Sequence, residues 1–234
     1  MAPARPARPS PHDPRESVIP TADRPGTFLA FEGGEGAGKS TQVRLLTDEL
    51  TAAGHRVRAT FEPGDTPAGA VVRRLVLDRA DLALSPRAEA LLYAADRAQH
   101  TAEVLLPALA AGEVVVTDRF VDSSLAYQGA GREIPREEVA GISRWATQAL
   151  VPDLTVLLDL PPATGLARAR GRAAADRIEA ESLDFHERVR QTFLELAAAE
   201  PSRYLVLDAT RPADELAAAI RERVTALLAP AGTP

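Results

Sequence analysis

Lys39 is the only lysine of this 234-residue chain, although Lys and Arg together number 27. It lies in the segment Gly33-Gly34-Glu35-Gly36-Ala37-Gly38-Lys39-Ser40, which fits the pattern G-x-x-x-x-G-K-S. Glycines allow the backbone to curl so that successive N–H groups point at one anion, and a following helix adds the positive end of its dipole. An ammonium group can reach the terminal phosphates of a nucleotide, and a hydroxyl can ligate Mg2+. The segment therefore predicts the binding of a nucleoside triphosphate.

The residues on either side complete the surroundings that such a loop, the P-loop of nucleotide enzymes, requires. Phe28-Leu29-Ala30-Phe31 before it is a short apolar run, typical of a strand buried on both faces. After it, Val43, Leu46 and Leu50 recur at helical spacing. Gly54 suits the position just beyond the end of that helix. A glycine-rich turn without a ligand, the alternative, would not need this order of strand, loop and helix.

A second group of chemically active residues follows another apolar run, Glu113–Thr117. Asp118 and Arg119 come directly after it. Asp118 can hold a water molecule bound to Mg2+ or orient an arginine, and Arg119 can hold a phosphate with its bidentate guanidinium. A structural ion pair is the alternative for these two residues. With a P-loop in the same chain, we expect both side chains to lie beside it and to handle phosphate.

Arginines are concentrated in a third segment, Arg168-Ala169-Arg170-Gly171-Arg172, which is followed by Asp176-Arg177. Its glycine and alanines are typical of a mobile flap between two helices. Phosphoryl transfer spreads negative charge over the moving group, and arginines that close over it would stabilise that charge and exclude water. The alternative is a solvated helix face whose arginines form ion pairs one turn apart.

The elements that must position these residues alternate between short apolar runs and longer helical patterns. The expected strands are Thr27–Glu32, Arg56–Phe61, Glu113–Thr117, Leu154–Leu160 and Tyr204–Leu207. The expected helices are 39–53, 66–78, 86–111, 135–149, 162–171, 180–199 and 212–228, the third opened by Ser85-Pro86. This alternation predicts an α/β fold of the P-loop NTPase type: a five-stranded parallel sheet flanked by helices on both faces, with a mobile arginine-rich lid. Ligands of such sheets gather at the carboxyl ends of the strands.

Composition limits the other possibilities. Residues 1–26 are rich in Pro and Arg, so we expect a disordered extension ahead of one domain over 27–230. A net charge of −6 argues against a nucleic-acid binder. The absence of a membrane-length apolar run and of a signal peptide favours a cytoplasmic protein without a membrane partner. The chain has no cysteine, and its histidines lack metal-ligand spacing, so each is interpreted as solvated or as a packing residue: His12, His55, His100 and His186.

Together these motifs resemble those of the thymidylate kinases, which phosphorylate dTMP at the expense of ATP. The resemblance covers about residues 27–228. A P-loop is shared by a whole superfamily, but the stretch from Ser123 to Gly129 after Asp118-Arg119 is far more specific. The matching segments are Phe31 through Thr41, Glu62-Pro63-Gly64, Tyr93 with Arg97, Asp118-Arg119, Ser123 with Tyr127-Gln128-Gly129, and Asp176-Arg177-Ile178-Glu179.

The resemblance implies two facing sets of binding residues. In the dTMP set, Tyr93 would stack on thymine, Arg97 would donate to thymine O4, and Tyr127 would crowd the sugar 2′ position. The other dTMP contacts would be Arg73 and Arg119 at the 5′-phosphate, Glu35 near the 3′-hydroxyl, and Ser123, Ser124 and Gln128 around the base. The ATP contacts would be Gly33, Gly34, Glu35, Gly36, Ala37, Gly38, Lys39, Ser40, Thr41 and Arg168. Ser40 and Asp118 would hold Mg2+, and the catalytic group would be Lys39, Arg119, Arg172, Asp118 and Glu35.

Members of this family carry the catalytic arginine either in the P-loop or in the lid. The P-loop interior here, Gly34 to Ala37, contains no arginine, whereas the flap contains three. The resemblance therefore places the chain with the bacterial lid-arginine class. Arg172 becomes the first candidate for the catalytic arginine, with Arg168 and Arg170 next.

Two positions depart from the family pattern. Phe61 stands where many relatives have arginine, so a phosphate contact from that position is lost or supplied elsewhere. Asp65 stands where glycine is common. The segment Asp208-Ala209-Thr210 resembles the loop on the adenine side, and the family implies a homodimer that pairs through helices.

Other functions stay open at this point. A kinase for UMP or CMP would share the P-loop, although Tyr93, Arg97 and Tyr127 argue against it. A regulatory GTPase normally reads guanine with Asn-Lys-x-Asp, and this chain has no asparagine. A binding module without turnover would keep the phosphate contacts. Transfer to dTMP needs no strong base, since the second pKa of a phosphate is about 6, so we expect catalysis by positioning and charge neutralisation.

Overall fold

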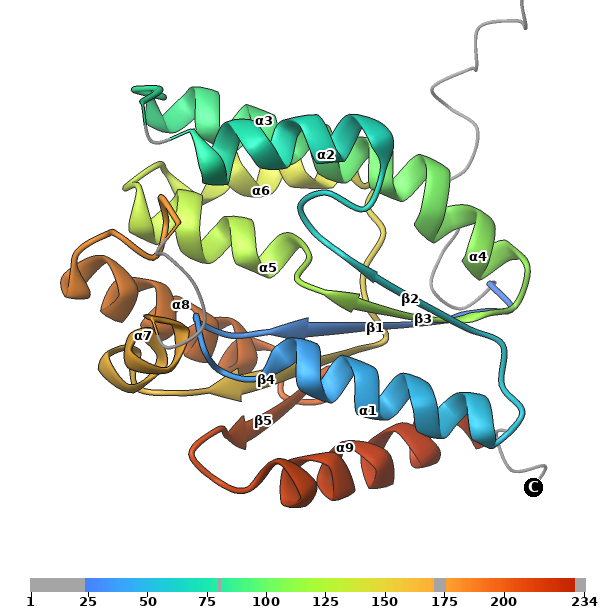
Figure 1. Ribbon diagram of the computed structural model, residues 1–234. Coiled ribbons are helices and arrows are strands. Elements are labelled where there is room, and N and C mark those ends of the chain that lie inside the picture. The colour runs from blue at the N-terminus through green and yellow to red at the C-terminus, as the bar shows by residue number, and fades with distance from the viewer. Residues whose placement is uncertain (1–23, 80, 171–175, 230–234) are drawn as a thin grey trace, which may run out of the picture.

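Five parallel strands form the centre of the computed structural model, which describes residues 24–79, 81–170 and 176–229. The sheet has the order β2-β3-β1-β4-β5 (Figure 1). The strands are β1 (Thr27–Glu32), β2 (Val57–Phe61), β3 (Val114–Asp118), β4 (Leu154–Asp159) and β5 (Tyr204–Asp208). The predicted five-stranded parallel sheet is confirmed, and each strand end lies within one residue of its predicted position.

The register of the sheet brings three loops to one edge. β1 lies in the middle, between β3 and β4, and its Phe31 is in register with Asp118 of β3. Asp118 is in turn in register with Phe61 of β2. The segments that leave these strands, beginning at Glu62, Gly33 and Arg119, therefore start side by side, as the rule for parallel sheets predicts.

Two long helices cover one face of the sheet, below it in Figure 1: α1 (Lys39–Ala52) and α9 (Ala213–Leu228). Leu29 and Phe31 of β1 point toward this face and belong to one buried cluster with Leu46 and Ile220. Alternate residues of the same strand, Phe28 and Ala30, pack on the opposite side. β1 is thus apolar from Phe28 to Phe31, since both of its faces are covered by helices.

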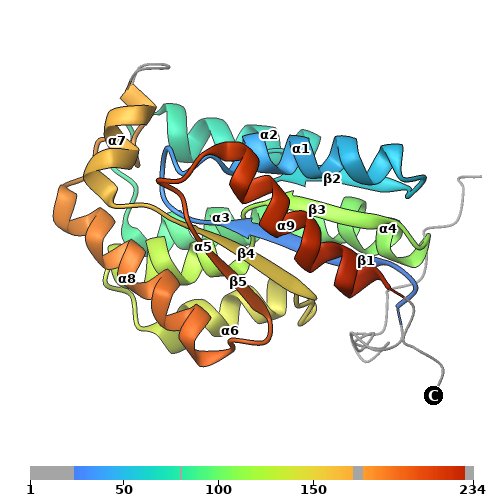
Figure 2. The ribbon, with the colours of Figure 1, turned by 90° about the horizontal axis from the view of Figure 1, so that it is seen from below.

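The opposite face carries a thicker layer of helices (Figures 1 and 2). Its members are α3 (Pro86–His100), α4 (Leu106–Ala110), α5 (Val121–Ser124), α6 (Arg136–Ala146) and α8 (Leu183–Ala199), with α2 (Pro67–Arg73) packed on α3 and α7 (Pro162–Arg170) on α8. Three wider π-helical segments complete it: η2 (Arg74–Asp78), η3 (Thr101–Leu105) and η4 (Leu125–Gly131). Helices on both faces of the sheet were predicted and are found.

The structure differs from the sequence prediction at three helical segments. The helix expected over 86–111 is interrupted at η3, where Pro107 two residues further on lacks the N–H that a regular turn would use. The helix expected over 66–78 likewise widens into η2. No helix was expected between Val121 and Gly131, where α5 and η4 lie.

Two expectations fall partly outside the described residues. The extension expected over residues 1–26 is described only from Arg24, whose guanidinium contacts the Asp153 carboxylate at 2.6 Å. Of the arginine-rich flap, Gly171 and Arg172 lie outside the described ranges. The disordered extension and the mobile lid therefore stay predictions.

Candidate active site

A cavity of about 670 Å³ opens at the edge of the sheet where β1, β2 and β3 end. The two sets of residues that were predicted to face each other both line it. The predicted residues in its wall are Glu35, Gly36, Ala37, Gly38, Lys39, Ser40, Thr41, Arg73, Tyr93, Arg97, Asp118, Arg119, Ser123, Ser124, Tyr127 and Gln128. One concave site thus holds the P-loop and the residues expected to recognise an acceptor.

Lys39 begins α1 and extends back over the P-loop. Its Nζ donates to the carbonyl oxygens of Gly33 and Gly34, both at 2.9 Å, which fixes the ammonium beneath the glycine turn. Burial, with Arg119 nearby, lowers the pKa of Lys39 to about 8. A phosphate bound in the loop would replace the solvation that Lys39 has lost, and would therefore favour the charged form of its ammonium group.

The start of α1 also offers hard oxygen ligands. The Ser40 hydroxyl donates to Asp118 Oδ2 at 2.8 Å, so the P-loop and the end of β3 present a hydroxyl and a carboxylate together. Oxygen donors of this kind suit Mg2+. Gly38, immediately before the helix, has a φ of 94°, and a Cβ atom built there would meet no atom within 4 Å. The open space above Gly38 is the room that a phosphate group needs.

Arg119 occupies the centre of the cavity wall. Its backbone has a φ of 74°, an uncommon conformation for a residue with a side chain and one that often marks functional sites. The guanidinium donates to Ser123 Oγ at 3.1 Å and to Glu35 Oε1 at 3.1 Å, and it lies 5.0 Å from the centre of the Tyr127 ring. Arg119 therefore joins the P-loop to η4.

Glu35 is held by partners from several elements. Besides Arg119, Oε1 accepts from the Tyr127 hydroxyl at 2.6 Å, and Oε2 lies 3.3 Å from Nδ1 of His186 on α8. Burial alone would raise the pKa of Glu35, but His186, Arg119 and Lys39 together hold it below its ordinary value. Glu35 is thus an anion held between the cationic side chains of Arg119 and Lys39.

Beneath Arg119 lies a second buried carboxyl, Glu32. It accepts from the backbone N–H groups of Phe120 at 2.8 Å and Ser123 at 3.2 Å, and it shares a 2.6 Å hydrogen bond with Ser123 Oγ. Burial, reinforced by the nearby Asp122 carboxyl, raises the pKa of Glu32 to about 8. The last residue of β1 thereby anchors the start of α5, on which the wall beside Arg119 depends.

The acceptor side of the cavity contains a buried ion pair. Arg97 of α3 donates to Glu62 Oε2 at 2.6 Å, to Ser124 Oγ at 2.7 Å and to the Phe120 carbonyl at 2.9 Å. The other Glu62 oxygen lies 2.8 Å from Nδ1 of His100. Arg97 and Glu62 are each 2% exposed at their side chains, and the remaining Arg97 N–H groups have no acceptor among the described residues.

Tyr93 lies one turn before Arg97 on α3 and lines the same cavity. Burial, followed by the nearby Glu89 carboxylate, raises the pKa of its phenol, so the ring stays neutral. An aromatic face and a fixed guanidinium thus stand side by side, as the spacing of four residues predicts. Such a pair suits a planar heterocycle that carries a carbonyl oxygen.

The comparisons with known proteins agree with this geometry. The family model described as thymidylate kinase matches residues 31–220. A thymidylate kinase of Clavibacter michiganensis is 55% identical over 205 residues, which cover 87% of this chain and 97% of that protein. One from Deinococcus radiodurans is 57% identical over 195 residues, 83% of this chain and 94% of that protein. The chain belongs to the thymidylate kinase family. A crystal structure of thymidylate kinase from Ehrlichia chaffeensis superimposes with a TM-score of 0.68 at 28% identity, covering 86% of this chain and 98% of that one.

The resemblance predicted that a phosphate contact at Phe61 is lost or supplied elsewhere, and in the structure a guanidinium lies beside this residue. Arg73 of α2 lies over the Phe61 ring, 5.8 Å from its centre, and donates to the Pro63 carbonyl at 2.7 Å. Asp65 accepts from the Thr60 hydroxyl at 2.5 Å and also lines the cavity. The Arg73 guanidinium of α2 and the Phe61 ring therefore lie together in this part of the cavity wall.

The predicted arginines of the flap have different positions. Arg168 of α7 is not part of the cavity wall; its guanidinium donates to the Ala209 carbonyl at 3.0 Å, in the loop expected on the adenine side. α7 packs against the P-loop, because a Cβ on Gly36 would come within 2.2 Å of the Gly165 carbonyl oxygen. Arg172, the first candidate for the catalytic arginine, lies outside the described residues.

Some residues of the site were not found by sequence reasoning. The histidines were interpreted as solvated or packing residues, but His100 and His186 are buried and contact Glu62 and Glu35. Glu32 was quoted only as part of the P-loop segment. No sequence spacing links these partners, since each pair joins elements far apart in the chain. Within the described ranges, no cluster of three or more His, Cys, Asp or Glu residues suits a metal ion, and no helix could cross a membrane.

Proposed function

We infer that this protein transfers the γ-phosphoryl group of ATP to dTMP and forms dTDP, the reaction of the family to which it belongs. The supporting observation is that Tyr93, Arg97 and Arg119 line the same cavity as Lys39. A donor triphosphate on the P-loop and a monophosphate nucleotide beside Tyr93 would therefore meet at Arg119. The geometry suits direct transfer between two substrates in one site.

On the donor side, we propose that the P-loop from Gly33 to Thr41 holds the phosphates of ATP. Its backbone supplies N–H donors, and Lys39 supplies a charge to the β- and γ-phosphates. Ser40 and Asp118 fit a Mg2+ ion, because their oxygens already lie 2.8 Å apart. When bound, Mg2+ would neutralise phosphate charge during transfer.

On the acceptor side, Tyr93 stacks on the base and Arg97 donates to its O4 oxygen. Arg97 suits this role because Glu62 and Ser124 fix its guanidinium while leaving N–H groups without protein acceptors. Cytosine carries an amino donor at position 4, which a guanidinium repels. Ser124 lies against Arg97, and Ser123 and Gln128 complete the wall around the base.

The acceptor phosphate and sugar contact the remaining side chains. Arg119 and Arg73 hold the 5′-phosphate in line with the donor, since both guanidinium groups line the cavity. Tyr127 limits space at the sugar 2′ position. Its hydroxyl is fixed by Glu35, which is placed to address the 3′-hydroxyl. Catalysis then follows from positioning and from neutralising charge, with no base needed.

Arg172 is proposed to stabilise the transferring group, with Arg168 and Arg170 as the next candidates. The backbone of Arg168 lies close to the P-loop, because its Cβ is 3.1 Å from where a Cβ on Gly36 would be. It is therefore adjacent to the P-loop even though its guanidinium contacts Ala209. Replacement of Arg172 by alanine should lower kcat and leave dTMP affinity nearly unchanged; an equal loss of affinity would make it a binding residue.

A panel of nucleoside monophosphates tests the proposed reaction. With ATP and Mg2+ present, ADP release should be fastest, in kcat/KM, for dTMP among dTMP, dUMP, dCMP, UMP and CMP. A preference for UMP or CMP would overturn the assignment of the acceptor. ATP binding without turnover of any monophosphate would identify a binding module instead.

We also propose that the protein forms a homodimer in the cytoplasm, where ATP-dependent nucleotide synthesis takes place. α3 packs against both α2 and α6, and the three helices expose the apolar side chains Val71, Leu91 and Trp145, the last 83% exposed. A second copy that covers these side chains would remove apolar surface from water. Sedimentation should show a dimer that the Trp145→Glu variant dissociates; a monomeric wild type would contradict the proposal.

A further inference from the structure

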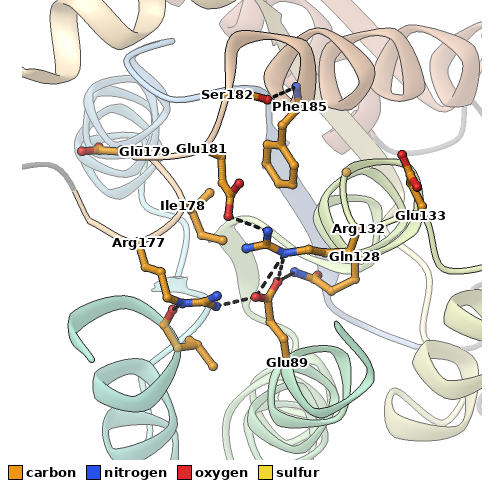
Figure 3. A network of polar contacts seen from close by, with 12 residues as sticks. Glu89, Gln128, Arg132, Glu133, Arg177, Ile178, Glu179, Glu181, Ser182 and Phe185 are labelled. Atoms are coloured by element: carbon orange, nitrogen blue, oxygen red, sulfur yellow. Dashed lines mark hydrogen bonds and ion pairs between the residues drawn. The ribbon is translucent and has the colours of Figure 1, made fainter. Parts of the chain in front are cut away.

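Glu89 of α3 is a buried carboxylate whose function the reaction described above leaves unexplained. Its side chain is 1% exposed, although it lies one turn before Tyr93 on the helix that carries the base-binding residues. Figure 3 shows three side chains that converge on it: Gln128 of η4, Arg132 and Arg177. Gln128 Nε2 donates to Glu89 Oε1 at 3.0 Å, Arg132 Nε donates at 3.1 Å, and an Arg177 Nη donates to the other oxygen.

This contact determines which way the Gln128 amide faces. A carboxylate flanked by two guanidinium groups is ionised and accepts hydrogen bonds only, so the amide must present its NH2 group to Glu89. Burial would raise the pKa of Glu89, but hydrogen bonds from Arg132, Gln128 and Arg177 lower it below its ordinary value. The opposite orientation would place the Gln128 oxygen against a carboxylate oxygen without a proton between them.

The other end of the amide is consequently an acceptor. Gln128 lines the cavity, and no described residue donates to its Oε1. With the amide NH2 group turned to Glu89, the oxygen faces away from Glu89. The cavity that Tyr93 and Arg97 line thus also contains a side-chain acceptor, the Gln128 oxygen.

Arg132 and Arg177 keep Glu89 ionised and in place. Arg177 is itself fixed by a 2.8 Å hydrogen bond from Nε to the Val76 carbonyl, and Arg132 also contacts Glu181. Ile178, which follows Arg177, lines the cavity. Glu89 therefore joins α3, η4 and the segment of Arg177 and Ile178 around one side of the base pocket.

We propose that Glu89 is a positioning residue that selects the base by fixing the Gln128 amide so that its oxygen accepts a hydrogen bond from a ring N3–H. This proposal rests on the proposed function and deepens it. Thymine and uracil carry an N3–H donor, whereas the N3 atom of cytosine is an unprotonated acceptor and repels the Gln128 oxygen. Sites built to satisfy a specific hydrogen bond discriminate strongly against the analogue that cannot form it.

The test compares three nucleotides. Dissociation constants of dTMP, dUMP and dCMP are measured by calorimetry for the wild type and for Glu89→Gln. In that variant a neutral amide faces Gln128 and can present either an oxygen or an NH2 group, so both Gln128 orientations become available. The preference for dTMP over dCMP should fall about tenfold or more, as expected when a hydrogen bond from a fixed group is lost. The preference for dTMP over dUMP should change less than twofold, because both bases carry N3–H.

Two matched variants separate positioning from general loosening of the fold. Glu138→Gln removes a carboxylate of α6 that pairs with Arg87 at the surface, and both preferences should stay at their wild-type values. Gln128→Leu should reduce the dTMP-over-dCMP preference as Glu89→Gln does, and the double variant should show no further reduction. Gln128→Leu also provides the measurement if Glu89→Gln does not fold.

The outcomes distinguish the inference from the proposed function. An unchanged dTMP-over-dCMP preference in Gln128→Leu, or equal loss of both preferences in Glu89→Gln, overturns the role of Glu89. A wild type that does not bind dTMP overturns the proposed function instead. Additive losses in the double variant would show that Glu89 acts other than through Gln128 and would also overturn the inference.

Discussion

The two halves of the cavity are built in different ways. The donor half is made from one continuous segment, Gly33 to Thr41, and most of its predicted contacts come from the backbone. The acceptor half takes side chains from several elements, including α2, α3 and η4. Its key residues are fixed by buried charged contacts such as Arg97 with Glu62 and Gln128 with Glu89.

This difference predicts where each half is sensitive. A backbone-built cradle depends on glycine conformation and on the one charge of Lys39, so many side-chain changes around it should be tolerated. In a pocket built from buried polar side chains, each side chain needs its partner. Removal of one partner leaves the other buried and charged, without a hydrogen bond, which lowers the unfolding free energy. Substitutions in the acceptor half should therefore affect folding and specificity together, whereas those in the donor half should affect activity alone.

The largest effect on stability is expected for Glu62→Gln, in the acceptor half. It leaves the 2%-exposed Arg97 without its charged partner, and His100 loses the same carboxylate. Breaking a buried pair costs about 3–5 kcal/mol of unfolding free energy. Urea denaturation followed by circular dichroism measures it. Glu49→Gln breaks an exposed pair with Arg221 and should cost less than about 0.5 kcal/mol. Equal costs for the two variants would contradict the importance of the buried Glu62 contacts.

Arg119 lies between the halves, and its removal should reduce catalysis most. Arg119→Ala loses the guanidinium that contacts Glu35 on one side and Ser123 on the other. Loss of one fixed charged donor at a transferring group costs about 3–4 kcal/mol, a fall in kcat/KM of about 10²–10³. Steady-state kinetics with dTMP and ATP measures it. Near-normal kcat/KM in Arg119→Ala would refute the phosphate role, and Arg119→Lys should recover only part of the activity.

The room for an added methyl group can be compared at one glycine from each half. A Cβ on Gly69, in α2, would lie 2.3 Å from Asp96 Oδ1, whereas a Cβ on Gly34 would meet nothing within 4 Å. Gly69→Ala should therefore destabilise the protein by about 1–3 kcal/mol. Gly34→Ala should change the unfolding free energy by less than about 0.5 kcal/mol. Thermal unfolding compares the two, and similar shifts in Tm would be the contrary result.

At neutral pH the smallest effect is expected from a pH dependence of the donor half, which grows only above pH 8. The pKa of Lys39 is lowered to about 8, so its ammonium is charged below that pH and loses its proton above it. For free enzyme, kcat/KM for ATP should fall above pH 8 and lose about tenfold for each further pH unit. Bound phosphates favour the charged form, so the corresponding fall in kcat should come at higher pH. A kcat/KM profile that is flat from pH 7 to 10 would contradict this assignment.

The donor half could be predicted from sequence because its residues are contiguous. The strand, the glycines and Lys39 follow local rules, and Gly54 follows α1 with a φ of 90° as predicted. In the acceptor half, the cap at Ser85 also follows a local rule, since its hydroxyl accepts from the Ala88 N–H. The pairing of Tyr93 with Arg97 was also within reach, since four residues span one helical turn.

The missed features have a common physical cause. The segment from Leu125 to Gly129 is buried at every position, so it shows no polar face and no helical period, and Gly129 argues against a helix. The contacts of Glu62 with His100 and of Glu89 with Arg177 join residues that only the folded chain brings together. A single sequence contains no spacing from which such pairs can be read.

The contact between Gly36 and Gly165 has a mechanical consequence. A Cβ on Gly36 would lie 2.2 Å from the Gly165 carbonyl oxygen, and a Cβ on Gly165 would lie 2.2 Å from that of Glu35. The two backbones are in direct contact, with no side chain between them. The first turns of α7 must therefore shift whenever the P-loop shifts. The fluorescence of a label on the exposed Thr164 of α7 should therefore change when a nucleotide binds to the P-loop.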